Sequence, residues 1–321
     1  MKFRTEINIG KYPFEIDYRS RGFMIGSCFA DNMAARLASA KFRVLSNPTG
    51  VMYNPMSVVS TLRTLFSRRR FSESDLMQHD GRWFSLDFHG SFSDTQPERA
   101  LDGMNDAVMR GAEALAASDY VIVTLGTAWV YEKDGRTVAN CHKLPAAEFE
   151  RRLLSTDEIA GALSSAMERE LNGKDVVFTV SPIRHLKDGF AGNSLSKALL
   201  RVAVEDVVRR YDRAHYFPSF EIMNDDLRDY RFYEADMAHP SVSAVDYIWE
   251  KFRGAFLSEQ AVEILPQVEK IVDASRHRPI DSRSEQYRSF CRKFLSQAQL
   301  LSQRCEGLDL ESEIAYFGSF C

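Results

Sequence analysis

The sequence predicts an α/β fold: a mostly parallel central sheet covered by helices on both faces, followed by a C-terminal helical extension. Strand-like apolar segments alternate with amphipathic helical segments, which is typical of parallel strands joined by right-handed crossovers. The 321 residues are 45% hydrophobic and 12% aromatic, enough to fill a large core.

The first part of the chain alternates between two short strands and two helices. Apolar runs predict strands over residues 23–26 and 42–45, and helical spacing of apolar residues predicts helices over residues 30–40 and 56–66. The sequence Asn47-Pro48-Thr49-Gly50 ends the second strand, because asparagine, proline and glycine favour turns.

The middle of the chain contains the most strand-like segment. Residues 71–94 are rich in aromatic residues without clear periodicity, and residues 83–89 fit either a hairpin strand or a loop packed over the site. A long helix is predicted over residues 96–117. It leads into the apolar, β-branched run of residues 120–125, which we expect to be a central strand.

Two further helices flank another buried strand. Ser155 and the acidic residues after it are N-capping signals for a helix that Gly173 is placed to close. Residues 176–180 form the next predicted strand and residues 193–211 the next helix. The apolar face of that helix is expected to contain Leu195, Leu199, Val202 and Val207.

Polar segments directly follow three of the predicted strands. Ser27 follows the first strand, Gly126-Thr127 follows the central strand, and Ser181-Pro182-Ile183-Arg184-His185 follows the strand over residues 176–180. Parallel strands end at a common edge of the sheet, where α/β proteins bind their ligands. We therefore expect a site at this edge.

Two distant motifs supply a nucleophile and its base. Ser27 lies on the tight strand-to-helix turn Gly26-Ser27-Cys28, and Asp236 and His239 lie three residues apart far downstream. A histidine can take the serine proton while a carboxylate orients the histidine. Without the downstream pair, Ser27 would be interpreted as an N-cap residue. With it, we expect a triad of Ser27, His239 and Asp236.

The net charge indicates which partners to expect, and the cysteines indicate the redox compartment. The formal net charge is −4 and the isoelectric point about 6.0, so the chain lacks the basic excess of nucleic-acid-binding or membrane-binding proteins. The five cysteines are odd in number, scattered and without a Cys-x-x-Cys pair, which favours a reducing compartment. We expect neither nucleic acid nor a membrane as a partner.

Cofactor and targeting signals are also missing from the sequence. No set of histidines and carboxylates has metal-ligand spacing, and there is no glycine-rich phosphate loop, so we expect no metal and no cofactor. Residues 1–6 carry charges where a secretory signal would need an apolar run, and no apolar segment has the length of a membrane span. We therefore expect a cytoplasmic protein.

A longer set of motifs resembles one known family. Gly26-Ser27-Cys28-Phe29-Ala30 is the signature string of the GSCFA family, which looks like a branch of the SGNH/GDSL hydrolase superfamily. The resemblance implies an SGNH-hydrolase-like three-layer α/β/α sandwich over residues 1–258, with residues 259–321 as a helical extension packed on it. Further matching stretches are Tyr53-Asn54-Pro55, Asp87-Phe88-His89, Leu125-Gly126-Thr127-Ala128-Trp129, Asn140-Cys141-His142-Lys143, Ser181 to His185, and Asp225 to Ser241.

The resemblance also implies roles for single residues. The Gly-Asp-Ser of the superfamily's first block is Gly-Ser-Cys here, which leaves Ser27 or Cys28 as the nucleophile. Ser27 is preferred, because a cysteine that begins the helix is expected to point into the core. The superfamily's last block, Asp-x-x-His, falls on Asp236 and His239.

The implied oxyanion hole lacks one of its usual donors. Such enzymes use the backbone N–H of the nucleophile, here Ser27, a glycine N–H, for which Gly50 is the candidate, and an asparagine side chain. The third block reads Gly126-Thr127-Ala128-Trp129 and lacks that asparagine. We expect a substitute donor from one of three residues: Thr127, Asn54 or Asn140.

Together these features predict a serine-dependent esterase or deacylase acting on a small-molecule or carbohydrate-linked acyl ester. The residues expected to bind that substrate are His89, His142, Arg184 and His185. Two alternatives remain open: an O-acyltransferase that uses the same triad, and a non-catalytic carbohydrate- or protein-binding module on the same fold.

Overall fold

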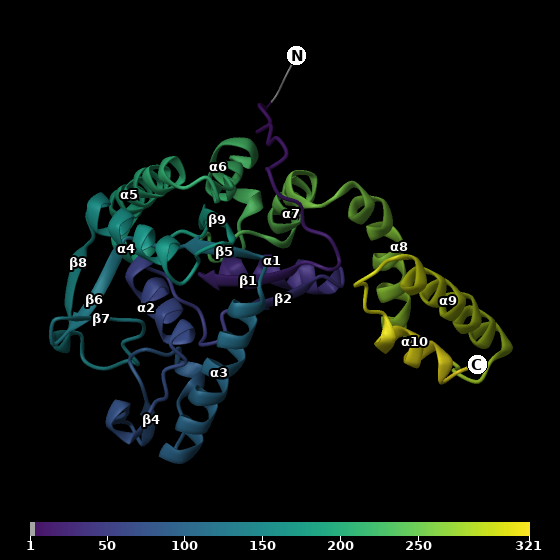
Figure 1. The fold of residues 1–321 in the computed structure, drawn as a ribbon, viewed down its shortest axis with the longest axis horizontal. Coiled ribbons are helices and arrows are strands. Elements are labelled where there is room, and N and C mark those ends of the chain that lie inside the picture. Colours follow the sequence, from purple (N-terminus) through teal and green to yellow (C-terminus); the bar gives the residue numbers. More distant parts are fainter. Residues whose placement is uncertain (1–3) are drawn as a thin grey trace. The chain divides into compact units, whose positions relative to one another are not determined.

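The computed structural model describes residues 4–321, which form two compact units (Figure 1). The first unit contains residues 4–8, Gly22–Met33 and Leu45–Ile248, and the second contains Ile9–Arg21, Ala34–Val44 and Trp249–Cys321. The charged N-terminal stretch used to predict the compartment lies partly outside the described residues, since residues 1–3 are not described. The predicted domain boundary at residue 258 stays a prediction.

A five-stranded parallel sheet forms the centre of the first unit, in the order β10-β9-β5-β1-β2. In β5, Ile122 pairs with Met24 of β1 on one side and with Val177 of β9 on the other. The predicted α/β fold with a mostly parallel sheet is thereby confirmed. The strands are β1 (Arg21–Gly26), β2 (Arg43–Ser46), β5 (Tyr120–Leu125), β9 (Asp175–Val180) and β10 (Ala214–Tyr216).

Helices cover the sheet and complete a three-layer sandwich (Figure 1). Four of them, α2 to α5, share one buried core with the sheet, in which Phe23 and Val123 of the strands cluster with Leu62, Leu163 and Leu200 of the helices. The helices are α1 (Cys28–Ser39), α2 (Pro55–Phe66), α3 (Pro97–Ala117), α4 (Thr156–Glu168), α5 (Gly189–Arg210), α6 (Ser219–Glu221) and α7 (Val242–Phe256). All six residues of β5 are buried, as expected for a strand in the middle of the sheet.

Local sequence explains where two of these helices begin. Asn54 caps α2 by accepting a hydrogen bond from the Ser57 N–H at 2.8 Å, and Pro55 occupies the first position, where its missing N–H costs nothing. Ser155 and Glu158 form a reciprocal capping box at the start of α4. The α4 capping signal was predicted from the sequence, whereas the capping role of Asn54 was not.

Several short strands were not predicted. A hairpin of β3 (Met77–His79) and β4 (Arg82–Phe84) begins within the aromatic segment, so the hairpin alternative applies to the start of residues 83–89 and the loop alternative to the rest. A second, antiparallel sheet has the order β7-β6-β8. These strands have three to five residues each, too few to show a period of two. Their bounds are Trp129–Lys133 for β6, Arg136–Val138 for β7 and Glu150–Leu153 for β8.

The predicted apolar face of α5 is wrong at Leu195 and Val202, whereas Val207 is buried and Leu199 packs against the core. Leu195 and Val202 are 51% and 58% exposed, whereas Ser196 and Lys197 are each 2% exposed. The N-terminal part of the helix buries polar side chains because these bind the loops that follow β5 and β9. Further along, Leu200, Ala203, Val204 and Val207 continue the same face with apolar side chains.

The second unit is helical and has its own aromatic core. Phe294 and Phe317 stack at 5.6 Å between ring centroids, and Lys41 forms a 2.6 Å ion pair with the largely buried Glu313. Its helices, which complete the expected helical C-terminal region, are α8 (Glu259–Arg276), α9 (Glu285–Arg304) and α10 (Glu311–Gly318).

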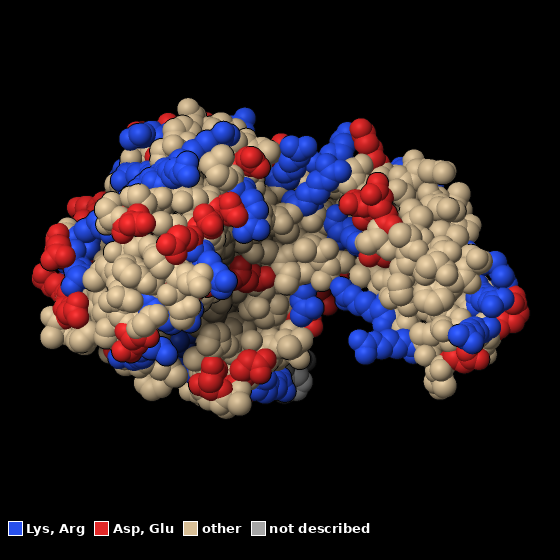
Figure 2. All heavy atoms as spheres, turned by 90° about the horizontal axis from the view of Figure 1, so that it is seen from below, with Lys and Arg blue, Asp and Glu red and all other residues tan. Residues whose placement is uncertain are grey.

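Positive and negative side chains are interspersed over the face drawn in Figure 2, in line with the small net charge. Within residues 4–321, no helix is both long enough and apolar enough to cross a bilayer.

Candidate active site

The turn after β1 has a backbone that requires glycine. Gly26 has φ +137°, and a Cβ atom there would lie 2.0 Å from the Thr124 carbonyl oxygen of β5. Asn47 holds the same turn, because its Oδ1 accepts from the Gly26 N–H at 2.8 Å and its Nδ2 donates to Asp31 at 2.9 Å. The Asn47 turn is thus part of the site's scaffold, a role that the sequence did not indicate.

The two candidate nucleophiles differ in burial. Ser27 is 1% exposed, and its hydroxyl accepts a hydrogen bond from the Phe29 N–H at 3.3 Å. Cys28, the first residue of α1, is partly exposed. Ser27 was preferred because Cys28 was expected to point into the core. The structure instead buries Ser27 and leaves Cys28 partly exposed, because the strand-to-helix turn directs the serine inward.

The downstream pair forms a hydrogen bond. Asp236 Oδ2 lies 2.5 Å from Nδ1 of His239, and Asp236 Oδ1 accepts from the backbone N–H groups of Ala238 and His239 at 2.9 and 3.0 Å. These N–H groups and the imidazole lower the pKa of Asp236 to about 2. Met237 between them has φ +56°, a strained backbone for a residue with a long side chain.

The Asp236–His239 loop is attached to the segment after β9. The Arg184 N–H donates to the Ala238 carbonyl at 3.1 Å, and the Arg184 guanidinium donates to the Met237 carbonyl at the same distance. The guanidinium also lies over the Tyr233 ring, 5.3 Å from its centroid. Arg184, predicted to bind substrate, therefore also positions the loop. In the described chain the Ser27 hydroxyl has no hydrogen bond to His239, whose side chain is 49% exposed.

His185 follows Arg184 in the segment after β9. Its ring nitrogen Nε2 is buried and has no hydrogen-bond partner within the described residues. Its backbone N–H donates to Asn193 Oδ1 at 2.9 Å. Burial, and then the charges of Lys197 and His239, lower the pKa of His185 to about 4. The imidazole is therefore neutral at pH 7, with one buried ring nitrogen left to bind a ligand or water.

Lys197 is a part of the site that sequence reasoning missed. It is 2% exposed, and its Nζ donates to the carbonyl oxygens of Gly126 and Ser181, each at 2.7 Å. It therefore joins the carboxyl ends of β5 and β9. Burial lowers the pKa of Lys197 to about 7, against the opposing effect of the Cys28 thiol. The available signal was the spacing of Lys197, which lies three and seven residues before the buried apolar residues Leu200 and Val204 and so on the same face of the helix.

Most of the expected oxyanion donors are engaged elsewhere in the structure. The Ser27 N–H donates to the Thr124 carbonyl at 3.0 Å, and the Gly50 N–H to the Asn47 carbonyl at 2.8 Å. The Thr127 N–H donates to the Tyr53 carbonyl at 2.9 Å. The Thr127 hydroxyl lies 3.1 Å from the Ser196 hydroxyl, and the Asn54 amide donates to Ser57 at 3.0 Å.

Asn140, His89 and His142 lie in one loop cluster. His142 Nε2 is 2.9 Å from the Ser85 carbonyl oxygen, and its ring stacks on Phe84 at 4.2 Å. Burial lowers the pKa of His142. Asn140 Oδ1 accepts from the His142 N–H at 2.9 Å, and His89 Nδ1 lies 3.0 Å from the Ser91 hydroxyl. In the structure, these three residues therefore contact one another or nearby residues of the same loops.

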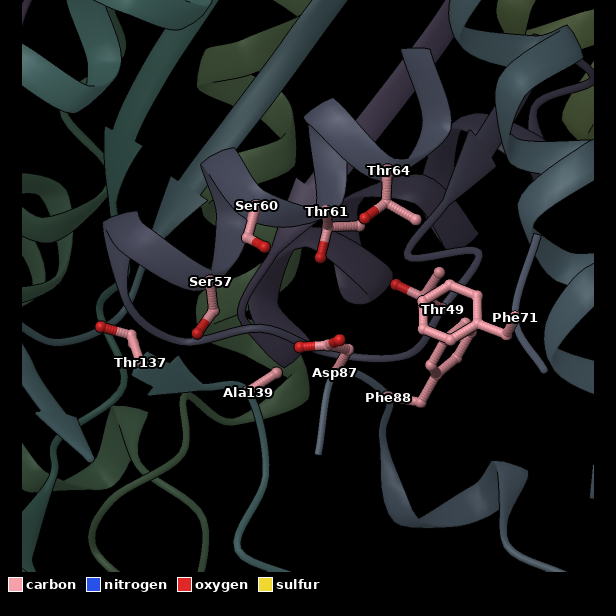
Figure 3. A pocket seen from close by; sticks show the side chains of 10 residues that line it. All are labelled: Thr49, Ser57, Ser60, Thr61, Thr64, Phe71, Asp87, Phe88, Thr137 and Ala139. Atoms are coloured by element: carbon pink, nitrogen blue, oxygen red, sulfur yellow. The ribbon is translucent and has the colours of Figure 1, made fainter. Parts of the chain in front are cut away.

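A small polar cavity lies beside α2 (Figure 3). Its volume is about 10 Å³, enough for about one water molecule. Thr49, which is 2% exposed, directs a hydroxyl without a protein partner in the described chain into it (Figure 3). Ser57, Thr61 and Asp87 line the same cavity. Among residues 4–321, no group of three or more His, Cys, Asp or Glu side chains is placed to hold a metal ion.

These features define an α/β protein with a candidate nucleophile and a histidine–aspartate pair in loops beyond the carboxyl ends of parallel strands, where this class of fold carries its sites. The model of the GSCFA family matches residues 21–252, and the model described as GSCFA domain protein, C-terminal domain, matches residues 268–320. The chain therefore belongs to the GSCFA family. A comparison with curated proteins found no match.

Proposed function

We propose that the chain is an acyl-ester hydrolase, an esterase or deacylase of the SGNH type, with His239 and Asp236 as its base. Acyl esters of small molecules or of carbohydrates are the proposed substrates. The observation that carries the proposal is the 2.5 Å contact of His239 Nδ1 with Asp236. It fixes the proton on Nδ1, so that Nε2 is free to accept a proton from a nucleophile.

In the proposed reaction, a side chain of the Ser27-Cys28 turn attacks the acyl carbon. His239 takes the nucleophile's proton and passes it to the leaving alcohol oxygen as the ester C–O bond breaks. Water then attacks the acyl-enzyme with His239 as the base, the bond to the enzyme breaks, and the free acid leaves. Arg184, which supports the loop, and His185, whose Nε2 is unpartnered among the described residues, are the proposed groups near the substrate.

Exposure of the imidazole favours hydrolysis over transfer. The His239 side chain is 49% exposed, so water reaches the base directly. In the aromatic segment of residues 71–94, Phe71 and Phe88 belong to the core, where they are 2% and 1% exposed. An O-acyltransferase would need to exclude water from the acyl-enzyme.

The test is a panel of acyl esters of graded chain length, assayed with and without sugar acceptors. We expect hydrolysis by the wild type and its loss in His239→Ala. His79→Ala is the matched control, because His79 is a second histidine beside a carboxylate, 3.5 Å from Asp80. Acyl transfer to the sugar in preference to water would favour the transferase. No turnover of any ester, with sugar binding retained, would favour the binding module.

A further inference from the structure

Arg184 is a partly exposed arginine of the candidate site whose charge has no counter-ion in the described chain. Its guanidinium makes one hydrogen bond within residues 4–321, from Nη1 to the Met237 carbonyl oxygen at 3.1 Å, and no ion pair. Most N–H donors of the guanidinium are therefore left without a protein partner. An arginine keeps its charge at every pH suited to an assay, so the charge is permanent.

Three aromatic rings and two backbone contacts fix the position of this side chain. The guanidinium carbon lies 4.9 Å from the ring centroid of Phe190, 5.3 Å from that of Tyr233 and 5.8 Å from that of Tyr230. The backbone N–H of Arg184 donates to the Ala238 carbonyl at 3.1 Å. Rings attract a guanidinium through their faces and leave the N–H groups at its edge free. The donors are therefore held in place before a ligand binds, which lowers the entropic cost of binding.

The guanidinium is attached to the loop that carries the proposed base. Met237, whose carbonyl binds the guanidinium, precedes His239 by two residues. The His239 side chain is 49% exposed, and the rings of Tyr230 and Phe190 belong to residues that are 63% and 67% exposed. The cation, the rings and the imidazole are therefore all accessible to a ligand that approaches from solvent.

A second arginine on the segment before this loop has its charge compensated by the protein. The guanidinium of Arg231 also lies over an aromatic ring, 5.0 Å from the centroid of Phe232, but its Nε lies 3.7 Å from a carboxylate oxygen of Asp229. Arg184 has the same kind of ring contact without such a carboxylate in the part of the chain that the structure describes. Its positive charge is therefore available to an anion that the ligand brings.

We propose that Arg184 determines substrate specificity by binding an anionic group of the substrate, a carboxylate or a phosphate. This role rests on the proposed function and narrows its substrates to acyl esters that carry a negative charge near the bond that is cleaved. The planar fork of the guanidinium matches two oxygens of either anion. Binding there brings the ester towards His239, because the guanidinium is attached to the backbone two residues before that imidazole.

The first experiment compares aryl acetates that differ only in the group para to the ester: para-acetoxybenzoate, para-acetoxyphenyl phosphate and the neutral para-acetoxybenzamide. We expect the wild type to have a kcat/KM about tenfold or more higher for one of the anionic esters than for the amide. The anion with the higher value distinguishes a carboxylate from a phosphate. In Arg184→Met, the ratio of anionic to neutral kcat/KM should fall by about ten- to a hundredfold. Arg184→Lys keeps the charge without the fork and should keep part of the ratio.

The ratio separates anion binding from support of the loop, because a displaced loop slows all three esters by the same factor. Arg231→Met is the matched control and should leave the ratio unchanged, since that charge is paired with Asp229. Equal losses for the three esters in Arg184→Met would overturn the anion site and leave the hydrolase proposal standing. A wild type that prefers neither anionic ester would overturn it as well, whether or not the variant folds.

The second experiment measures binding without turnover, so that it separates failure of the anion site from failure of the proposed function. Benzoate, phenyl phosphate and benzamide are titrated into the protein by isothermal calorimetry. We expect the wild type to bind one of the anions more tightly than benzamide, and Arg184→Met to raise the Kd of that anion about tenfold or more. If no ester is hydrolysed but this difference is present, the proposed function fails and the anion site remains. Equal affinity for the anions and benzamide would overturn the anion site.

Discussion

At the scale of single residues, the carboxylate of Asp236 is expected to matter through its charge. Its pKa of about 2, caused by the N–H groups and imidazole of the same loop, keeps it ionised at every pH suited to an assay. Asp236→Asn keeps the shape but no longer favours the Nδ1–H tautomer of His239. Such a change is expected to lower kcat by up to about 10⁴-fold.

A neighbouring residue supplies the control for Asp236→Asn. Glu234 lies on the same loop and contributes its backbone N–H to the His239 carbonyl at 2.8 Å. Glu234→Gln therefore removes a nearby charge without touching the imidazole. Steady-state ester hydrolysis should separate the two variants, and equal losses would indicate a general effect of loop charge.

Gly26 gives a prediction on stability. A Cβ at this position meets backbone oxygen 2.0 Å away with φ at +137°, so Gly26→Ala is expected to cost on the order of 3 kcal/mol in the free energy of unfolding. Gly161→Ala is the matched control. It lies within α4 with no atom within 4 Å of a new Cβ, and should stabilise by about 0.5–1 kcal/mol. Urea unfolding of both variants measures the difference.

At the scale of elements, the contacts of Asn54 are those of a helix N-cap, and a variant can test whether it also acts as an oxyanion donor. The side chain accepts from the Ser57 N–H and donates to the Ser57 hydroxyl, so Asn54→Ala should cost about 1 kcal/mol of stability, as for other N-caps. Ester turnover by the folded protein should stay within a few-fold of wild type. Ser155→Ala, at the cap of α4, is the control. A loss of turnover of about 100-fold or more would instead identify Asn54 as an oxyanion donor.

The predictability of each element follows its length and pattern. The apolar runs of β1, β5 and β9 and the periodic helices were predicted, and so was the edge of the sheet to which their loops lead. The short strand β10, with only three residues, carried no signal. The face of α5 was predicted wrongly because Leu195 and Val202 fit the helical spacing, whereas buried Lys197 reads as a surface residue until its two carbonyl partners are known.

The site, like the elements, could be predicted from the sequence only in part. Spacing predicted that Asp236 and His239 belong to one loop, and their hydrogen bond is present. The direction in which Ser27 and Cys28 point depends on the φ of Gly26 and on the contact with β5, which one sequence does not contain. Expectations from residue type, such as a cysteine packed in the core, therefore fail where a turn sets the direction of a side chain.

At the scale of the whole molecule, Lys197 should make stability depend on pH. Its pKa is about 7 in the folded chain and about 10.5 when unfolded, so between these values the unfolded state binds more protons. The free energy of unfolding should therefore rise from pH 7 to pH 9. Urea midpoints over this range should show a smaller slope in Lys197→Met, and an unchanged slope would mean that the amine is charged in the fold.

His185 gives a second dependence at lower pH. Its folded pKa of about 4 lies below the ordinary value of 6.5, so the unfolded state takes up the proton first as the pH falls. The free energy of unfolding should decrease from pH 6.5 towards pH 4. The carboxylate Asp236 contributes little at pH 4.5 and above, because the unfolded state takes up its proton only near the ordinary pKa of 3.8 and the folded state near 2. His185→Phe should reduce the decrease, as measured by urea midpoints at pH 6.5 and pH 4.5.

The central claim, that the Ser27-Cys28 turn carries an acyl group during turnover, is tested most directly by trapping that group. The protein is quenched in acid during hydrolysis of an activated acyl ester, digested, and analysed by peptide mass spectrometry. We predict the acyl mass on the peptide that contains Ser27 and Cys28. Release by neutral hydroxylamine would identify a thioester on Cys28, and resistance to it an oxygen ester on Ser27. Turnover with no acyl mass on either Ser27 or Cys28 would contradict the account.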